Sequence, residues 1–168
     1  MIAFRDGLPA DADMICALAR RTFSETFGHL YDPSDLAAFL AGHTPEQWRA
    51  ELSDPAFAIR LAERGGEAVG YAKLGPPSLP VTLRAPSIEL RQFYLVASAQ
   101  GTGAAQMMMA WVVATARARG AKDLYLSVFV DNHRARRFYE NHGFERIGDY
   151  GFMVGNHRDT DDLMRLTL

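Results

Sequence analysis

The chain has 168 residues, 48% of them hydrophobic and 23% charged, which fits one globular domain, residues 1–168, with a substantial core. The net charge of -2 excludes a general electrostatic attraction to nucleic acid or anionic membranes, and the single cysteine excludes an intramolecular disulfide framework. The N-terminus lacks a signal-peptide pattern, and no apolar run reaches the roughly 18 residues that a transmembrane helix needs. We therefore expect a cytoplasmic protein, and the sequence leaves a homodimer open.

The N-terminal part is predicted to form a strand followed by three helices. Residues 2–5 have the composition of a strand, and apolar residues at helical spacing from Met14 to Thr22 predict a helix directly after it. Helix-capping signals then predict two short helices, which begin near Asp32 and Thr44.

The middle of the chain is predicted to be mostly strand. Residues 57–63 and 68–74 flank the turn sequence Arg64-Gly65-Gly66-Glu67, which predicts a β-hairpin. Three prolines within residues 76–80 predict a loop, and residues 88–96 predict the next strand.

The C-terminal part alternates helices and strands. Its predicted elements are a helix at 103–119, a strand at 124–130, a helix at 132–142 and two final strands at 145–154 and 163–168. The strand, helix and strand between residues 88 and 130 predict a parallel crossover, and so a sheet of mixed direction.

The segment Gln100-Gly101-Thr102-Gly103-Ala104-Ala105 joins a predicted strand to a predicted helix and is the most informative part of the chain. Gly101 and Gly103 permit unusual backbone dihedral angles and the close approach of a ligand. The helix that begins at Ala104 and Ala105 presents unpaired N–H groups and the positive end of its dipole. The segment therefore predicts a binding site for a phosphorylated ligand.

Three kinds of phosphate-binding loop compete for this segment. The pattern Gly-x-x-x-x-Gly-Lys-Ser/Thr of nucleotide triphosphatases occurs nowhere in the chain. A dinucleotide fingerprint would need a third glycine where Gln106 stands, and the acidic residue at the expected distance, Asp123, precedes the next strand instead of ending it. The third pattern, Gln/Arg-x-x-Gly-x-Gly/Ala, is matched at every defined position, and it is the signature of GCN5-related N-acetyltransferases.

A second segment strengthens this resemblance. Residues 132–144 match the pattern Asn-x-x-Ala-x-x-Phe-Tyr-x-x-x-Gly-Phe, which resembles a later motif of the same family, and the two motifs stand in the family's order. The chain is similar to the GCN5-related N-acetyltransferase (GNAT) superfamily from its first strand to its C-terminal hairpin.

The resemblance implies an α/β fold with three layers, α/β/α, and a mixed, centrally splayed sheet that binds acetyl-CoA as co-substrate. The pyrophosphate would lie on the loop, the pantetheine arm would lie between the strands that end near Leu95 and Val130, and the Leu95 N–H would face the thioester oxygen. Asn132 would bind the pantetheine and can also cap its helix. The residues that the resemblance implies for acetyl-CoA are Phe93, Tyr94, Leu95, Gln100, Gly101, Thr102, Gly103, Ala104, Ala105 and Asn132.

Two residues are candidates for acid–base catalysis. Tyr139 occupies the family's tyrosine position, and a phenol with a reference pKa near 10 can donate a proton to a departing thiolate; the alternative is an aromatic residue packed beside Phe138. Glu89 is the candidate general base, because an acid on a central strand is unusual. Glu89 could equally orient substrate, act through water, or form a structural ion pair near Arg91.

Other chemistry has little support in the sequence. Arg134, Arg136 and Arg137 could reach the adenosine phosphates, although a solvated helix face explains them better. The histidines show no metal-ligand spacing, so we predict no metal. Two rival functions remain: a CoA-binding regulatory module without turnover, and a nicotinamide-dependent oxidoreductase. The intact Tyr139 argues against the first, and Gln106 against the second.

The acceptor is predicted to be a primary amine. The sequence resembles the bacterial spermine/spermidine N-acetyltransferase branch, and aromatic residues interleaved with acids suit a flexible polycation such as spermidine. Ordinary helix-end packing and capping explain the same residues about equally well, and other small amines or a protein N-terminus stay open as acceptors. The stretches that carry the resemblance are Thr22–Gly28 with Asp32 and Asp35, Glu89–Tyr94, Phe152–Gly155 and Asp162–Met164. The predicted substrate-binding residues are Phe23, Glu25, Phe27 and Tyr31.

Overall fold

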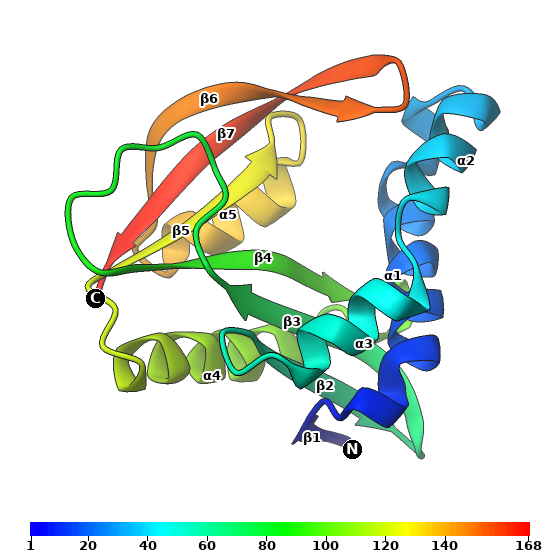
Figure 1. Ribbon diagram of the computed structural model, residues 1–168, viewed down its shortest axis with the longest axis horizontal. Coiled ribbons are helices and arrows are strands. Elements are labelled where there is room, and N and C mark those ends of the chain that lie inside the picture. Colours follow the sequence, from blue (N-terminus) through cyan, green and yellow to red (C-terminus); the bar gives the residue numbers. More distant parts are fainter.

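A computed structural model describes all 168 residues and shows one mixed seven-stranded sheet with helices on both faces (Figure 1). The strands are β1 (Ile2–Asp6), β2 (Ala58–Arg64), β3 (Glu67–Gly75), β4 (Ser87–Leu95), β5 (Asp123–Phe129), β6 (Glu145–Val154) and β7 (His157–Thr167). The helices are α1 (Ala12–Phe27), α2 (Pro33–Ala41), α3 (Pro45–Ser53), α4 (Ala104–Ala118) and α5 (His133–Asn141). The strand order is β1-β2-β3-β4-β5-β7-β6, and only β4 and β5 run parallel. The predicted mixed sheet and its parallel crossover are therefore confirmed.

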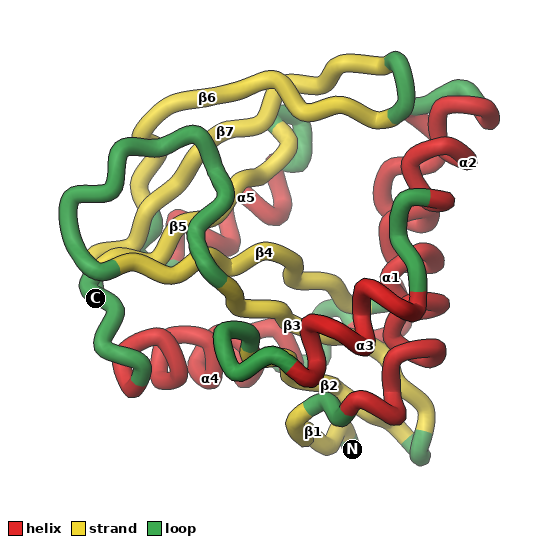
Figure 2. The backbone as a smooth tube through the Cα atoms, in the orientation of Figure 1, coloured by secondary structure: helices red, strands yellow, loops and turns green.

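The helices form two layers around the sheet, as the tube drawing shows (Figure 2). Trp48 of α3 packs edge-on against Tyr71 of β3 on one face of the sheet, where α1 also lies. On the other face α4 contributes buried Met108 and Val112 to the core, and Phe138 of α5 packs against β4. This is the three-layer α/β/α arrangement that the family resemblance implied. No helix has the combination of length and apolar character needed to cross a bilayer.

The predicted last strand was wrong at its start, because β7 begins at His157 and not at Leu163. The sequence from His157 to Asp162 is rich in acids, which are disfavoured in strands. Cross-strand pairing overrides this preference, since Asp161 lies opposite Phe129 of β5 on one side and Tyr150 of β6 on the other.

The central pair of strands separates along its length. Ser87, Ile88 and Glu89 of β4 pair with Asp123, Leu124 and Tyr125 of β5, and no residue beyond these pairs is in register. β4 continues to Leu95 and β5 to Phe129, so the two strands diverge toward their C-terminal ends. The predicted central splay is confirmed, and it opens the middle of the sheet.

A largely buried ion pair fastens α3 to β3. Lys73 Nζ lies 2.6 Å from Glu51 Oε2, and it also lies 4.2 Å from the centre of the Trp48 ring. Burial lowers the pKa of Lys73, and the hydrogen bond to Glu51 opposes that shift. The lysine charge therefore depends on Glu51 for most of its compensation.

We expect Glu51→Ala to lower the free energy of unfolding by about 3 kcal/mol at pH 7, because it leaves the Lys73 charge buried without its partner. Burial keeps the pKa of Lys73 in the folded state below its usual value of 10.5, so the unfolded chain binds more protons and the variant gains stability as pH rises toward 10. Urea unfolding at pH 7 and pH 10 measures both effects. Glu46 is exposed on the same helix and supplies the control, since Glu46→Ala should lower the free energy of unfolding by less than about 1 kcal/mol. Equal losses for the two variants would contradict the prediction.

Candidate active site

A cleft of about 800 Å³ occupies the splay between β4 and β5. One end is bordered by the loop before α4 and by the start of α5, and the other end by α1, α2 and the β6–β7 hairpin. The cleft brings together Phe23, Glu25, Phe27, Tyr31, Phe93, Tyr94, Leu95, Gln100, Gly101, Gly103, Ala105, Asn132 and Tyr139 from the predicted site. Thr102 and Ala104 belong to the same loop without lining the cleft, and Glu89 lies outside it.

The loop from Gly101 to Gln106 presents six successive backbone N–H groups that have no acceptor within the protein; the first helical bond runs from Met107 N–H to Gly103 O. Gly101 and Gly103 have φ of +75° and +87°, and a Cβ added to either would meet nothing within 4 Å. Helix α4 has no side-chain cap. Free donors, open space and the helix dipole together fit a pyrophosphate, so the residues present suit the predicted CoA site.

The end of β4 offers a further free donor. Val96 N–H donates to Val69 O of β3 at 2.9 Å, and successive N–H groups of a strand point to opposite edges. The Leu95 N–H therefore points away from β3, toward β5, where the strands have parted. A carbonyl oxygen lying in the splay would accept a hydrogen bond from this group.

Side chains from α5 close the cleft beside the loop. Gln100 donates from Nε2 to Leu95 O at 3.3 Å and accepts a hydrogen bond from the Arg134 guanidinium, so it ties the end of β4 to α5. Asn132 caps α5 by accepting from Ala135 N–H at 3.3 Å and also lines the cleft. Its two predicted roles are compatible in this geometry.

Tyr139 reaches the cleft from α5 between aromatic neighbours. Its ring lies 6.4 Å from that of Phe93 and 5.6 Å from that of Phe138, and the residue is 8% exposed. Burial raises the pKa of Tyr139 above its usual value, with a smaller contribution from Tyr94. The phenol therefore stays protonated at neutral pH, as a proton donor must.

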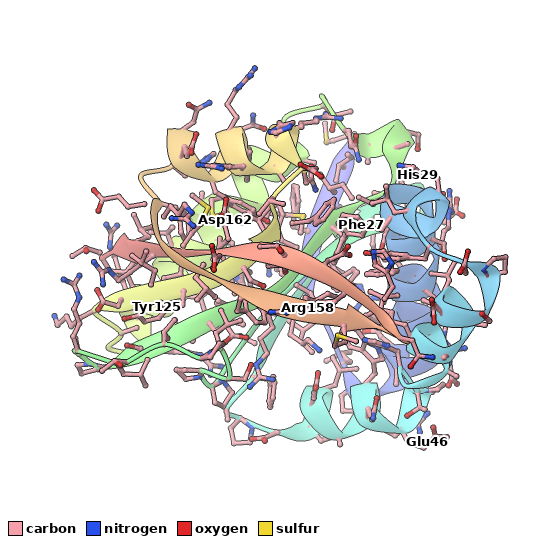
Figure 3. All side chains as sticks on the ribbon, turned by 90° about the horizontal axis from the view of Figure 1, so that it is seen from above. Phe27, His29, Glu46, Tyr125, Arg158 and Asp162 are labelled. Atoms are coloured by element: carbon pink, nitrogen blue, oxygen red, sulfur yellow. The ribbon has the colours of Figure 1, made fainter.

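Aromatic side chains form the wall at the opposite end. Phe23 stacks on Phe39 with ring centres 4.4 Å apart, and Phe27 meets Phe129 edge-on at 6.0 Å. Figure 3 labels Phe27 at the end of α1, where it approaches the sheet. Glu25 lines the cleft but its carboxylate is paired with Arg21 at 2.8 Å. A cationic ligand would meet Glu25 only in competition with that arginine.

Two carboxylates that the sequence did not single out also face this end, namely Asp159 and Asp161 of β7. The Tyr31 hydroxyl donates to Asp159, and burial raises the pKa of Asp161 to about 6. Their spacing could have identified them, because residues 159 and 161 lie on the same face of a strand. The predicted start of that strand was later, at Leu163.

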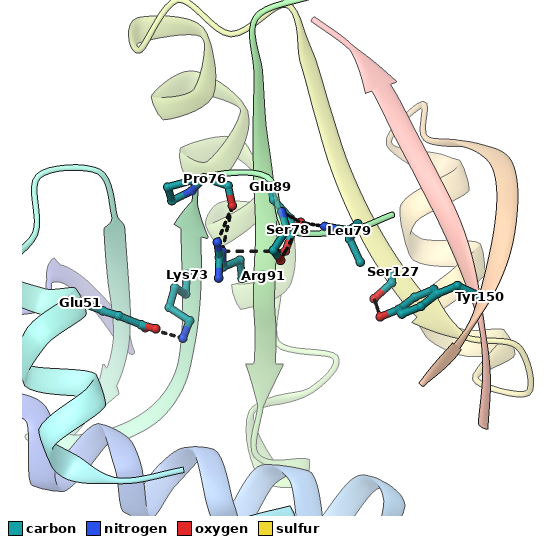
Figure 4. Close-up of polar contacts among 9 residues, drawn as sticks. All are labelled: Glu51, Lys73, Pro76, Ser78, Leu79, Glu89, Arg91, Ser127 and Tyr150. Carbon is teal, nitrogen blue, oxygen red and sulfur yellow. Dashed lines mark hydrogen bonds and ion pairs between the residues drawn. The ribbon is translucent and has the colours of Figure 1, made fainter. Parts of the chain in front are cut away.

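Glu89 has a different environment from the one that a general base needs. Its carboxylate accepts from the backbone N–H groups of Ser78 and Leu79 at 2.8 and 3.0 Å and from the Ser78 hydroxyl, and Arg91 Nε lies 3.8 Å away (Figure 4). It lies at the joined end of β4 and β5 and is 4% exposed. In this geometry Glu89 holds the 76–80 loop on the sheet.

Comparison with known proteins identifies the family. A model described as the acetyltransferase (GNAT) family matches residues 13–144. An uncharacterized N-acetyltransferase of Mycobacterium tuberculosis is 37% identical over 155 residues, covering 92% of this chain and 96% of that protein. The chain belongs to the acetyltransferase (GNAT) family. It is an acetyl-CoA-dependent N-acetyltransferase, which excludes the nicotinamide-dependent alternative.

Solved structures agree with this GNAT assignment at the level of the fold. The PaiA N-acetyltransferase of Thermoplasma acidophilum, solved in complex with coenzyme A, aligns with a TM-score of 0.81 at 16% identity over 100% of this chain and 99% of that one. Ribosomal-protein-alanine N-acetyltransferase of Brucella melitensis aligns with a TM-score of 0.74 at 25% identity over 99% of each chain. The GNAT family is thus shown, whereas the polyamine branch is not, and the acceptor must be inferred from the cleft.

The loop's role can be tested with two matched glycines. We expect Gly103→Glu to weaken CoA binding at least 100-fold, because a carboxylate about 4 Å from a phosphate costs about 4 kcal/mol at an effective dielectric constant near 20. Gly120, at the other end of α4, also has a positive φ, +80°, with nothing within 4 Å of an added Cβ, so Gly120→Glu imposes the same kind of backbone strain. Calorimetric titration with CoA and thermal unfolding compare the two variants. Similar CoA affinities would overturn the loop assignment.

Proposed function

We propose that this GNAT enzyme transfers acetyl directly from acetyl-CoA to a primary amine on a small cationic molecule, with a polyamine such as spermidine as the favoured class. One observation carries the proposal: the cleft is continuous from a row of free N–H donors to a pocket lined by aromatic rings and carboxylates. The first end suits a pyrophosphate and the second a cation. The two substrates would meet where Leu95 and Tyr139 lie.

The chain's own groups divide the work of transfer. Acetyl-CoA supplies an activated acetyl group when bound. The N–H groups from Gly101 to Gln106 hold its phosphates, and the Leu95 N–H stabilises charge that develops on the thioester oxygen. Tyr139 keeps a proton for the departing sulfur. Both substrates are held side by side, so no acylated residue is needed.

Two other functions deserve a test against this one. Acetylation of a protein N-terminus has one observation in its favour, because the Brucella melitensis structure is named as a ribosomal-protein-alanine N-acetyltransferase and aligns over nearly the whole chain. A CoA-binding module without turnover is disfavoured by the buried, protonated Tyr139 in the cleft. Release of free thiol from acetyl-CoA, measured with spermidine, n-butylamine and an alanine-initiated peptide, distinguishes all three. Turnover with the peptide alone would overturn the polyamine proposal, and no turnover with any acceptor would favour the binding module.

We expect Tyr139→Phe to lower kcat by about 10²–10⁴-fold, the usual effect of losing an acid–base group, while the Kd for CoA stays within about twofold. The phenyl ring preserves packing against Phe93 and Phe138, so binding should survive. Tyr125→Phe is the control, because Tyr125 is also a buried tyrosine, 1% exposed, but lies outside the cleft. Steady-state thiol release and calorimetry give the two constants. An unchanged kcat in Tyr139→Phe would reduce Tyr139 to a packing residue.

The Arg21–Glu25 pair supplies opposing variants for the acceptor. Glu25→Gln should raise KM for spermidine by several-fold and leave KM for n-butylamine nearly unchanged, because only the polyamine carries a second ammonium for this carboxylate. Arg21→Gln should do the reverse and lower KM for spermidine, since it frees Glu25 from its partner at 2.8 Å. Both constants come from initial rates at low ionic strength. Parallel shifts for the two amines would show that Glu25 does not contact the acceptor.

A further inference from the structure

The acidic strand β7 divides its carboxylates between the two faces of the sheet. Asp162 points toward α5, where it pairs with Arg136 at 2.9 Å and with Arg146 at 2.7 Å, and Figure 3 labels it on the side of β7 where α5 lies. Asp159 and Asp161 face the cleft. The two arginines compensate the buried charge of Asp162. They do not contact Asp159 or Asp161, so the burial of those two carboxylates needs a different explanation.

Asp159 and Asp161 are equally buried but differ in their partners. Each is 8% exposed. Asp159 accepts a hydrogen bond from the Tyr31 hydroxyl and lies 3.1 Å from His157 Nε2. Asp161 forms no ion pair with any lysine, arginine or histidine, and the only side chain that lowers its pKa, and so favours its charged form, is Ser127. A buried carboxylate that faces a cleft without a cation would be stabilised in its charged form by a cationic ligand.

Three tyrosines from different elements share the surroundings of Asp161: Tyr150 is its partner on β6, and Tyr31 and Tyr94 line the same cleft. Burial is the main cause that raises the pKa of Tyr31, which precedes α2, of Tyr94 on β4 and of Tyr150 on β6, and the charge of Asp161 adds to each shift. Tyr94 directly precedes Leu95, whose N–H faces the splay. Asp161 itself pairs with Phe129 at the end of β5, so its carboxylate faces the cleft from the strand next to the splay, and it lines the same cleft as Tyr94 and Leu95.

We propose that Asp161 binds the ammonium group of the acceptor and accepts its proton, so that Asp161, and not Glu89, is the catalytic base. The inference rests on the proposed function, since it assumes an amine acceptor. It assigns Asp161 a role that Asp159 cannot take, because Asp159 is already engaged by Tyr31 and His157.

The proton and electron balance is complete with groups on this chain. One proton passes from the ammonium nitrogen to the Asp161 carboxylate, and the freed lone pair forms the C–N bond to the acetyl carbon. The C–S bond breaks, and its electron pair stays on sulfur, which takes a proton from the Tyr139 hydroxyl. A second proton leaves the nitrogen and returns to Tyr139, directly or through water. Asp161 releases its proton to solvent, so each turnover yields amide, thiol and one proton.

The titration of Asp161 suits this role. Burial raises its pKa to about 6, with contributions from Asp159 and Asp162, while the Ser127 hydroxyl opposes the shift. At pH 7 such a group is about 90% ionised and still a stronger base than an ordinary aspartate. The other titratable groups that face it are Asp159 with its partner His157, Tyr31, Tyr94 and Tyr150.

The pH dependence of kcat/KM for Asp161→Asn tests the proposal. Wild type takes the ammonium form, so its kcat/KM should be flat from about pH 7 to the pKa of the amine, reach half its plateau near pH 6 and fall about tenfold per pH unit below that. Asp161→Asn can use only the neutral amine, so its kcat/KM should rise about tenfold per pH unit, and the ratio of wild type to variant should shrink about 500-fold from pH 6 to pH 9. Asp159→Asn should keep the flat region. A variant profile parallel to that of wild type, or a steepening of the Asp161→Asn profile to about 100-fold per pH unit below pH 6, would overturn the proposal.

A binding measurement keeps this inference separate from the proposed function. Titration of the apo enzyme with spermidine, or with an alanine-initiated peptide, at pH 6 in two buffers of different ionisation enthalpy gives the number of protons released. Wild type should release about 0.5 proton as the bound ammonium lowers the pKa of Asp161, Asp159→Asn should release somewhat less because the Asp159 charge helps to raise that pKa, and Asp161→Asn should release none. If the enzyme turns over but all three proteins release the same number of protons, the role of Asp161 is refuted and the proposed function stands. Neither turnover nor binding with either probe refutes the proposed function and this inference with it.

Discussion

The parting of β4 from β5 is the constraint on which the rest of the site depends. A parallel pair that stayed in register would use its backbone N–H and C=O groups within the sheet, whereas here pairing ends at Glu89 and Tyr125. The inner edges beyond that point, including the Leu95 N–H, are left to solvent or substrate. The loop from Gly101 to Gln106 also leaves backbone N–H groups without a partner, because no side chain caps the start of α4.

Packing on both faces of the sheet keeps the ends of β4 and β5 apart. The 76–80 loop covers the other end, where the two strands are paired. Phe93 on β4 meets Phe138 on α5, and Phe27 on α1 meets Phe129 on β5, so each diverging strand rests on a different helix. At the joined end, the Glu89 carboxylate draws the 76–80 loop onto the sheet through two backbone N–H groups and a hydroxyl. Charge-assisted bonds of this kind compensate a buried carboxylate, which makes Glu89 part of the scaffold.

Local signals in the sequence predicted most of this architecture, including the loop that is proposed to hold the donor. Glycines with positive φ, helix caps and helical spacing are properties of a few neighbouring residues, so the loop before α4 and the helices could be predicted closely. The acceptor half depends on pairing between distant strands. Asp161 becomes a cleft residue only because β5 and β6 flank β7, and Glu89 becomes a loop anchor only because the chain returns over it. The spacing of Asp159 and Asp161 indicates a shared strand face, but no local signal shows what that face meets, and none shows which loop covers Glu89.

One desolvated cleft acts in opposite directions on the two proton-transfer groups. Burial raises the pKa of Asp161 to about 6, which makes the carboxylate a better base, and raises the pKa of Tyr139, which makes the phenol a weaker acid. A phenol whose pKa exceeds its reference value of about 10 loses its proton unfavourably to a thiolate whose conjugate acid has a pKa near 8.5. The transfer from Tyr139 must therefore be coupled to return of the second proton from the acetylated nitrogen. This coupling explains why the donor should lie between the sulfur and the amine, within one continuous cleft.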